Sequence, residues 1–202
     1  MTSIVVISAG LSNPSSTRIL AERLGTATVA ALGEPTATAH LVELRDLAHL
    51  ITDAQLTGFA SGDLADAVHR VAEADAVVAV TPVFNASYSG LFKMFFDVLE
   101  DGVLEGKPVL IAATAGTPRH SLVLDFAMRP LFAYLRADVV ATGVFAASAD
   151  FGSGSNGTNA SLSERVDRAA SELADKVRRR GTVLPTDPFA DPTPFEDLLH
   201  RQ

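Results

Sequence analysis

Residues 76–90 read AVVAVTPVFNASYSG, an apolar run followed by a proline and a segment of polar and aromatic residues. The run from Ala76 to Thr81 is short and rich in valine, which is typical of a strand buried on both faces of a sheet. We expect Pro82 to end this strand, because proline has no N–H group to donate to a sheet. The spacing of apolar residues then predicts a helix from Leu91 to Glu100.

The same strand, loop and helix pattern recurs on both sides of this stretch. Apolar or alternating runs predict four more strands, at Ile4–Ser8, Ala39–Leu44, Pro108–Ala113 and Val139–Ala146. Helical spacing predicts four more helices, at Arg18–Leu32, Asp63–Glu73, about Leu122–Leu135 and Ser161–Arg180. Pro130 predicts a kink or break within its helix, and residues 53–61 fit neither pattern.

Short apolar strands that alternate with helices indicate a parallel sheet covered by helices on both faces. We therefore predict a three-layer α/β/α sandwich with five parallel strands in the order 2-1-3-4-5, forming one domain over residues 1–181. Residues 182–202 form an acidic tail with four prolines. This tail is either disordered or an arm that docks on its own domain or on a partner subunit.

Composition narrows the possible functions. The 202 residues carry a net charge of −8, which argues against a nucleic-acid-binding protein, because contacts to phosphates require a basic surface. The chain has no cysteine, which excludes disulfides, thiolate metal sites and a cysteine nucleophile, and its five histidines show no ligand spacing, so we expect no metal. The start, MTSIVVISAG, lacks the basic region of a signal peptide, and no apolar stretch approaches the ~18 residues of a membrane span. We therefore expect a cytoplasmic protein.

Three segments that join a predicted strand to a predicted helix are candidates for a binding site: Ala9–Thr17, Pro82–Gly90 and Thr114–Ser121. Each is rich in small or hydroxyl residues rather than acids. The carboxyl ends of parallel strands share one edge of a sheet, where ligands of such folds bind. We therefore expect the three loops to meet at that edge.

The first loop offers hydroxyl groups and backbone N–H groups at the start of a helix. Such a helix end favours an anion such as a phosphate, and Arg18 could add a positive charge. The alternative is that Ser15 or Ser16 simply caps the helix. The polar candidates of this loop are Ser12, Asn13, Ser15, Ser16, Thr17 and Arg18.

The second loop suits an aromatic ligand with a polar rim. Phe84 and Tyr88 supply flat apolar surface, and Gly90 permits a close approach of the backbone. Polar contacts could come from Asn85, Ser87 and Ser89. The alternative is a surface turn whose aromatic rings fold back into the core.

The third loop reads TAGTPRHS, from Thr114 to Ser121. Gly116, between Ala115 and Thr117, can present backbone N–H groups to the edge of a ring. His120 is the one titratable imidazole in the three loops; it is either a weak candidate for catalysis or a hydrogen-bonded structural residue.

Other nucleotide and hydrolase motifs are missing from the sequence. It contains neither the P-loop pattern G-x-x-x-x-G-K-[ST] nor the hydrolase elbow G-x-S-x-G. Gly152, Gly154 and Gly157 do match G-x-G-x-x-G, but they precede the last helix and no strand with a ribose-binding acid follows. We interpret this segment as a mobile loop at the rim of the site.

Taken together, the three loops resemble those of the NAD(P)H-dependent FMN reductases of flavodoxin-like fold, over residues 3–180. The first is similar to that family's phosphate loop, G-S-x-R-x-x-S-x-[ST], and the second to T-P-x-Y-N-x-S-x-S-G-x-L-K-x-x-x-D. The third resembles a segment of reductases that serve two-component monooxygenases. The matching residues of the second and third stretches are Thr81, Pro82, Asn85, Ser89, Gly90, Lys93, Asp97, Thr114, Gly116, His120, Asp125, Arg129 and Pro130.

The resemblance implies FMN as cofactor and NADPH or NADH as the hydride donor. It implies that the first loop holds the FMN phosphate, the second lines the isoalloxazine and ribityl chain, and backbone N–H groups of the third meet the pyrimidine edge. The resemblance and the loop residues together give these candidate cofactor-binding residues: Ser12, Ser15, Ser16, Thr17, Arg18, Pro82, Val83, Phe84, Asn85, Tyr88, Ser89, Thr114, Ala115, Gly116 and Thr117. No side-chain acid or base is required for hydride transfer itself.

The resemblance also implies a homodimer or tetramer, and delivery of reduced FMN to a monooxygenase, often a luciferase-like one. This sequence departs from the family pattern at two positions: Ser12 stands where arginine is common, and Phe84 where tyrosine is usual. Two other functions fit the same fold. One is a quinone or azo reductase that retains its FMN, and the other is a flavodoxin-like electron carrier without enzymatic activity. The sequence leaves open the preference between NADPH and NADH, the final electron acceptor and the role of the tail.

Overall fold

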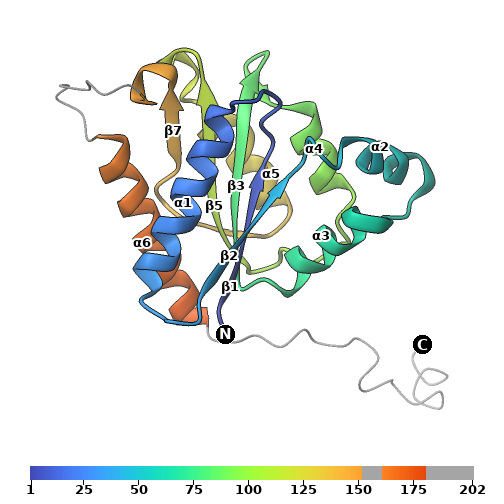
Figure 1. Cartoon of the computed structure of the whole chain (residues 1–202), viewed down its shortest axis with the longest axis horizontal. Helices are drawn as coiled ribbons and strands as arrows, with labels where there is room; N and C mark the ends of the chain where they lie inside the picture. The colour runs from blue at the N-terminus through green and yellow to red at the C-terminus, as the bar shows by residue number, and fades with distance from the viewer. Residues whose placement is uncertain (152–160, 181–202) are drawn as a thin grey trace, which may run out of the picture.

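A parallel sheet lies at the centre of the computed structural model, which describes residues 1–151 and 161–180 (Figure 1). Its strands are β2 (Thr38–Glu43), β1 (Ser3–Ser8), β3 (Ala76–Phe84) and β5 (Pro108–Ala115), in that order, followed by β6 (Asp138–Val139) and β7 (Val144–Ala147) along the far side of β5. A short strand, β4 (Ser87–Tyr88), pairs antiparallel with the end of β3. If β6 and β7 count as one interrupted strand, the parallel order is 2-1-3-4-5, as predicted.

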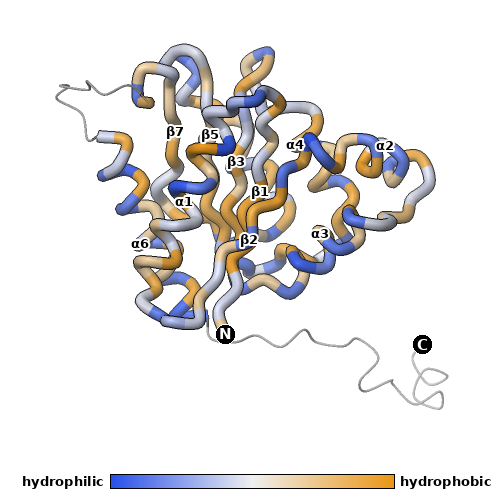
Figure 2. Tube along the Cα trace, in the orientation of Figure 1, coloured by the Kyte–Doolittle hydropathy of each residue, from blue (hydrophilic) through white to orange (hydrophobic). Residues whose placement is uncertain are grey.

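Helices cover both faces of this sheet, because its strands are apolar on both sides (Figures 1 and 2). α1 (Ser16–Leu32) and α6 (Leu162–Arg180) pack side by side on one face. The other face carries α2 (Ala48–Thr57), α3 (Gly62–Glu73), α4 (Gly90–Asp97) and α5 (Arg129–Tyr134). Successive strand residues alternate between the two cores: Ile4 and Val6 lie under α1, and Val5 and Ile7 face the opposite layer. The predicted sandwich is therefore confirmed.

The prediction that Pro82 ends the third strand is wrong, because β3 continues through it to Phe84. The carbonyl of Val80 accepts a hydrogen bond from Ala9 N (3.0 Å), so the even-numbered residues here turn their backbone groups toward β1. β1 has ended at Ser8, which leaves the ring nitrogen of Pro82 facing a position without a strand. The missing N–H group therefore costs no ladder bond.

The fifth strand is interrupted rather than continuous over 139–146 as predicted. β6 pairs Val139 with Val109, and β7 pairs Val144 with Ala112. Between these pairs, the four residues 140–143 lie opposite only two residues of β5, 110 and 111. The fifth strand therefore contains a bulge with two extra residues. Arg129 donates to the carbonyls of Val140 (3.0 Å) and Ala141, so the carbonyls released from the sheet keep donors.

Two other segments depart from simple helical patterns. Leu124–Met128 forms a π-helical turn just before α5, and Arg129 N bonds back to the carbonyl of Leu124. The irregularity predicted from Pro130 is confirmed, because proline cannot donate to the preceding turn. The sequence pattern does not predict α2, since its exposed Leu56 and the following Phe59 interrupt the helical spacing of apolar residues. The tail 182–202 and the glycine motif at 152–157 lie outside the described residues.

Lys107 is a buried charged group at the amino end of β5. Its Nζ donates to the carbonyls of Val71 (2.5 Å) and Ala72 (2.8 Å), which belong to the last turn of α3. Burial and, to a lesser extent, the charge of Arg180 together lower the pKa of Lys107 to about 8, while Asp75 opposes the change. The neutral amine keeps two N–H donors, enough for both carbonyls.

This pKa predicts a stability that increases with pH. The unfolded chain keeps Lys107 protonated up to its ordinary value of 10.5, so between about 8 and 10.5 the unfolded state binds more protons than the folded state. We expect unfolding free energy to rise by roughly 1–2 kcal/mol between pH 7.5 and 9.5. Urea unfolding across that range measures it. The Lys107→Met variant is the control, and an equal rise in both proteins would contradict the assignment to Lys107.

In the described part of the chain, every helix is too short or too polar to cross a membrane.

Candidate functional site

The three candidate loops lie beside one another at the carboxyl edge of the sheet (Figure 1). They follow β1, β3 and β5, which are adjacent strands, and Pro82 lies opposite Thr114 in the register of β3 and β5. The hydroxyl groups of Thr17 and Thr114 are 2.7 Å apart in a buried hydrogen bond that joins the first loop to the third. The predicted meeting of the three loops is what the fold produces.

In the first loop, the start of α1 is built for close backbone packing. Ser15 caps the helix, since its Oγ accepts from Arg18 N at 3.3 Å, so the capping interpretation holds for Ser15. The N–H groups of Ser16 and Thr17 precede the first intrahelical bond and are left for another acceptor. Gly10 passes so near that a Cβ there would lie 2.1 Å from Ser15 Oγ.

Two features of this loop fit a phosphate. The turn admits no side chain at Gly10, which brings the backbone close to the helix start, as in other phosphate-binding loops. Below it, Ser8 Oγ is the one buried side-chain polar atom in the described residues without a hydrogen-bond partner. Ser8 shares its strand face with Ile4 and Val6, which lie under α1, so this hydroxyl faces the same layer as the helix.

Arg18, which was predicted to add a positive charge to this loop, forms ion pairs with two glutamates instead. Arg18 bonds to Glu22 (Nε–Oε1 2.9 Å) and to Glu43 (Nη1–Oε1 2.8 Å). The hydrogen bond to Glu22 and the charge of Glu43 raise the pKa of Arg18 further above its already high value. These contacts turn the guanidinium toward β2.

Sequence reasoning missed Arg45, which follows β2 and reaches the first loop. Its Nη1 lies 3.4 Å from the carbonyls of both Leu11 and Ser12. Arg45 and this loop border a small hollow of about 160 Å³. The residues that line it are Ser12, Asn13, Ser15, Arg18, Glu43, Arg45 and Asp46. An arginine just past the carboxyl end of a neighbouring strand was the signal that could have found it.

The second loop is a tight hairpin rather than an irregular loop. Asn85 and Ala86 both have positive φ (49° and 66°) between the paired Phe84 and Ser87, which is the geometry of a two-residue type I′ turn. Phe84 is 47% exposed at the tip, while Tyr88 packs on the buried Phe92 with ring centroids 5.7 Å apart. One aromatic ring is therefore presented to solvent and the other turns to the core.

Ser89 forms its hydrogen bonds within the protein. Its Oγ caps α4 by accepting from Phe92 N (3.2 Å), and its own N–H donates to Thr81 Oγ1 (3.0 Å). With 1% of its surface exposed, Ser89 holds the hairpin against the helix and does not face the edge of the sheet.

In the third loop, Thr114 is buried against Thr17, Ala115 is half-buried, and Gly116 and Thr117 are exposed. Among the described residues, none lies within 4 Å of a Cβ built on Gly116, so the backbone is open on that side. His120 is exposed on a short 3-10 turn, Pro118–His120, away from the packed part of the loop.

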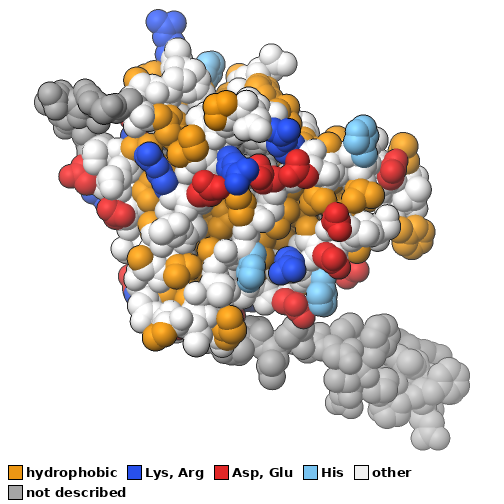
Figure 3. Space-filling model, viewed as in Figure 1, with side chains coloured by type: hydrophobic (Ala, Val, Ile, Leu, Met, Phe, Trp, Pro, Cys, Tyr) orange, Lys and Arg blue, Asp and Glu red, His pale blue; other side chains and the backbone are white. Residues whose placement is uncertain are grey.

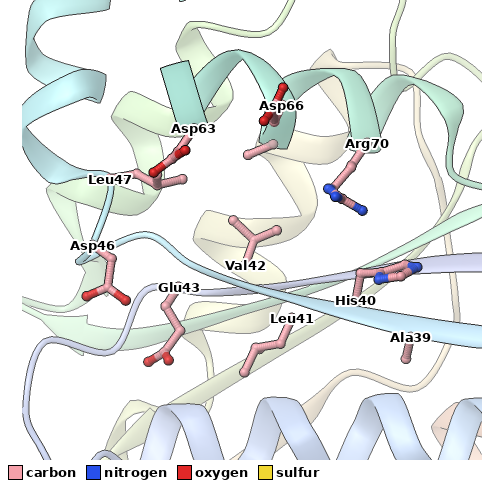
Figure 4. Close-up of a pocket in the computed structure, with 11 residues that line it drawn as sticks. Ala39, His40, Leu41, Val42, Glu43, Asp46, Leu47, Asp63, Asp66 and Arg70 are labelled. Carbon is pink, nitrogen blue, oxygen red and sulfur yellow. The ribbon is translucent and has the colours of Figure 1, made fainter. Parts of the chain in front are cut away.

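A larger hollow of about 510 Å³ lies along β2, between this edge strand and α3 (Figure 4). Arg70 points toward His40 at one end, and the carboxylates of Glu43 and Asp46 lie near the other. Asp63 and Asp66 add negative charge from α3. Four carboxylates make this hollow unfavourable for a phosphate, which favours the loop edge instead.

Charges of both signs lie between the two hollows. Figure 3 shows acidic and basic side chains side by side near the end of β2. The Arg18–Glu43 ion pair joins the start of α1 to the end of β2. Arg18–Glu22 lies within α1, and Arg45–Asp46 lies within the segment after β2.

Comparison with known proteins places this geometry in a family. The family model for NADPH-dependent FMN reductase matches residues 2–152. An FMN reductase (NADPH) from Pseudomonas aeruginosa is 36% identical over 149 residues, 73% of this chain and 78% of that protein. The NADH-dependent FMN reductase SfnE from Pseudomonas putida is 37% identical over 172 residues, 85% of this chain and 89% of that protein.

Solved structures agree with the sequence relatives. An oxidoreductase from Corynebacterium diphtheriae has a TM-score of 0.84 and 46% identity, covering 90% of this chain and 99% of that one. The apo form of an NADH:FMN oxidoreductase (EMOB) has a TM-score of 0.72 and 28% identity, covering 93% and 92%. An archaeal flavodoxin, at 15% identity and a TM-score of 0.58 over 88% and 99% of the chains, shares the fold. The chain belongs to the NADPH-dependent FMN reductase family.

Proposed function

We propose that this protein transfers a hydride from NADH or NADPH to FMN bound at the carboxyl edge of its sheet. The observation that carries the proposal is the Thr17–Thr114 hydrogen bond, which joins the first loop to the third across the strand that bears the second, beside a helix start that suits a phosphate. Bound FMN would supply the hydride chemistry. The chain's own residues would bind the FMN, orient it and cover one side of its ring system.

The first loop would hold the phosphate through the N–H groups of Ser16 and Thr17, at the positive end of the α1 dipole. Phe84, exposed on a rigid hairpin, would cover one side of the ring system. The open backbone at Gly116 would donate N–H groups toward the pyrimidine edge, where reduction adds negative charge. The buried Ser89 shapes the hairpin from behind.

We further propose that the protein is a cytoplasmic homodimer or tetramer that passes reduced FMN to a partner monooxygenase. Its support is the family resemblance of the third loop together with an apolar surface next to that loop. Leu122 and Phe126, on the π-helical segment and the turn before it, expose 61% and 78% of their surfaces. Exposed apolar side chains of this size favour a protein contact.

Oxidation of NADH and NADPH by the gel-filtered protein, with and without added FMN, tests the proposal. We expect turnover that requires added FMN and saturates with it. A yellow protein that oxidises the donor only when a quinone or azo dye is added would instead be a quinone or azo reductase. Protein that neither binds flavin nor oxidises either donor would overturn the proposal.

A further inference from the structure

We propose that Arg45 is the cation that faces the flavin phosphate, in place of the arginine that Ser12 replaces in the phosphate loop. The inference rests on the proposed function and adds a specificity-determining residue to it. Arg45 comes from the segment after β2, outside the loop that carries the other phosphate contacts.

The ion pairs of Arg18 hold its side chain away from the position proposed for the phosphate. Its guanidinium is shared between Glu22 and Glu43 at 2.9 and 2.8 Å, on the side of α1 that faces β2. A phosphate that recruited Arg18 would have to separate it from two carboxylates, which leaves Glu43 unpaired beside the incoming anion.

Arg45 is held much more loosely. In the described part of the chain its carboxylate partner is Asp46, at 3.5 Å from Nε, and the Asp46 side chain is 68% exposed. Exposed pairs of this length contribute little free energy. The contacts from Nη1 to the carbonyls of Leu11 and Ser12 are both 3.4 Å, so they orient the guanidinium over the loop. They use N–H groups of Nη1 only, and no contact in the described residues uses the two N–H groups of Nη2.

The hollow beside Arg45 contains the other groups that a phosphate needs. Ser12, Asn13 and the cap residue Ser15 line the same hollow as Arg45. Arginine binds phosphate oxygens through two parallel N–H groups, and the geometry suits a group anchored from below by helix N–H groups. The phosphate could belong to FMN or to a nicotinamide nucleotide, and we assign it to FMN because the hollow adjoins the start of α1.

The same hollow predicts a modest strength for this contact. Arg18 and Arg45 face Glu43 and Asp46, so two positive and two negative side chains line it. A phosphate therefore enters a site with no net charge, and Asp46 competes for Arg45. Replacing Asp46 with Asn should tighten FMN binding about twofold to threefold, since one competing charge is removed.

The test compares FMN with riboflavin, which lacks the phosphate, using the quenching of flavin fluorescence to measure Kd. For Arg45→Met we expect FMN to bind about fivefold to tenfold more weakly and riboflavin to bind as before. Arg70→Met is the charge-matched control, because Arg70 lies at the far end of the hollow along β2; it should change both Kd values by less than twofold.

Four results would overturn the inference. Equal weakening of FMN and riboflavin in Arg45→Met would show that Arg45 supports the loop and not the phosphate. A phosphate-dependent loss in Arg18→Met/Glu43→Gln, which removes one charge of each sign, would assign the phosphate to Arg18. A loss of NADPH affinity in Arg45→Met with unchanged FMN affinity would assign Arg45 to the nicotinamide nucleotide. Wild-type protein that binds neither flavin would defeat the proposed function itself, and the inference with it.

Discussion

Gly10→Ala is expected to weaken FMN binding by about 30-fold, which corresponds to about 2 kcal/mol. The added Cβ would lie 2.1 Å from Ser15 Oγ, 3.1 Å from Thr17 Cβ and 3.2 Å from Ser15 Cβ. Rotation of the hydroxyl relieves the first contact but breaks the cap on Arg18 N. The other two involve carbons fixed by the first turn of α1, so the loop must move away from the helix start. Its N–H groups would then no longer converge on one anion.

Flavin titration of three variants separates these effects. Ser15→Ala removes only the cap hydroxyl and should cost about 1 kcal/mol of stability. If Gly10→Ala/Ser15→Ala binds FMN as well as Ser15→Ala alone, the hydroxyl contact accounts for everything and the loop displacement is refuted. Gly90→Ala is the matched control, because no described residue lies within 4 Å of a Cβ there; its FMN affinity should stay within twofold.

The sequence predicted the architecture because its strands are apolar on both faces. Runs such as Ile4–Ser8 and Ala76–Thr81 have no solvent side, and only a sheet covered twice can bury them. The order of strands follows from the same constraint, because helices must pack on both faces with right-handed crossovers. The positions of the three loops come from the order β1-β3-β5, so the sequence also located the candidate edge.

What the sequence could not predict depends on contacts between distant segments. Pro82 inside β3 is tolerated only because β1 has already ended beside it. The bulge of the fifth strand is stabilised by Arg129, which lies on a different element. The turn at Asn85 has a local signal, an asparagine that accepts positive φ, yet the strand pairing around it was not recognised.

The site residues divide in the same way. Loop membership correctly brought Thr17 and Thr114 to one edge, where they bond to each other. It could not tell that Ser89 turns inward as a cap, or that the charge of Arg18 is taken up by two glutamates. Arg45 was missed because it lies after β2, in a segment without hydroxyl or glycine signals. The direction of each side chain depends on its packing against other elements, which cannot be predicted from the sequence of one loop.

Phe92→Ala is expected to lower the free energy of unfolding by about 3–5 kcal/mol and also to weaken flavin binding. Phe92 is completely buried, and its ring lies 4.8 Å from that of Phe96 and 6.3 Å from that of Phe132. Its third neighbour is Tyr88, on the hairpin that presents Phe84. Removing the ring leaves a cavity in the core and takes away the support under the hairpin.

Phe96→Ala separates core stability from hairpin support. Phe96 is equally buried, and its ring partners are Phe92, Phe95 and Phe132, all in the core. Both variants should lower Tm by a similar amount, about 6–20 °C for a chain of this size, while Phe59→Ala, at an 80% exposed position, should leave Tm nearly unchanged. Only Phe92→Ala should raise the Kd for FMN and riboflavin alike, since the hairpin faces the ring system and not the phosphate. If both core variants weakened flavin binding equally, the site would depend on global stability, and the specific support of the hairpin by Phe92 would be refuted.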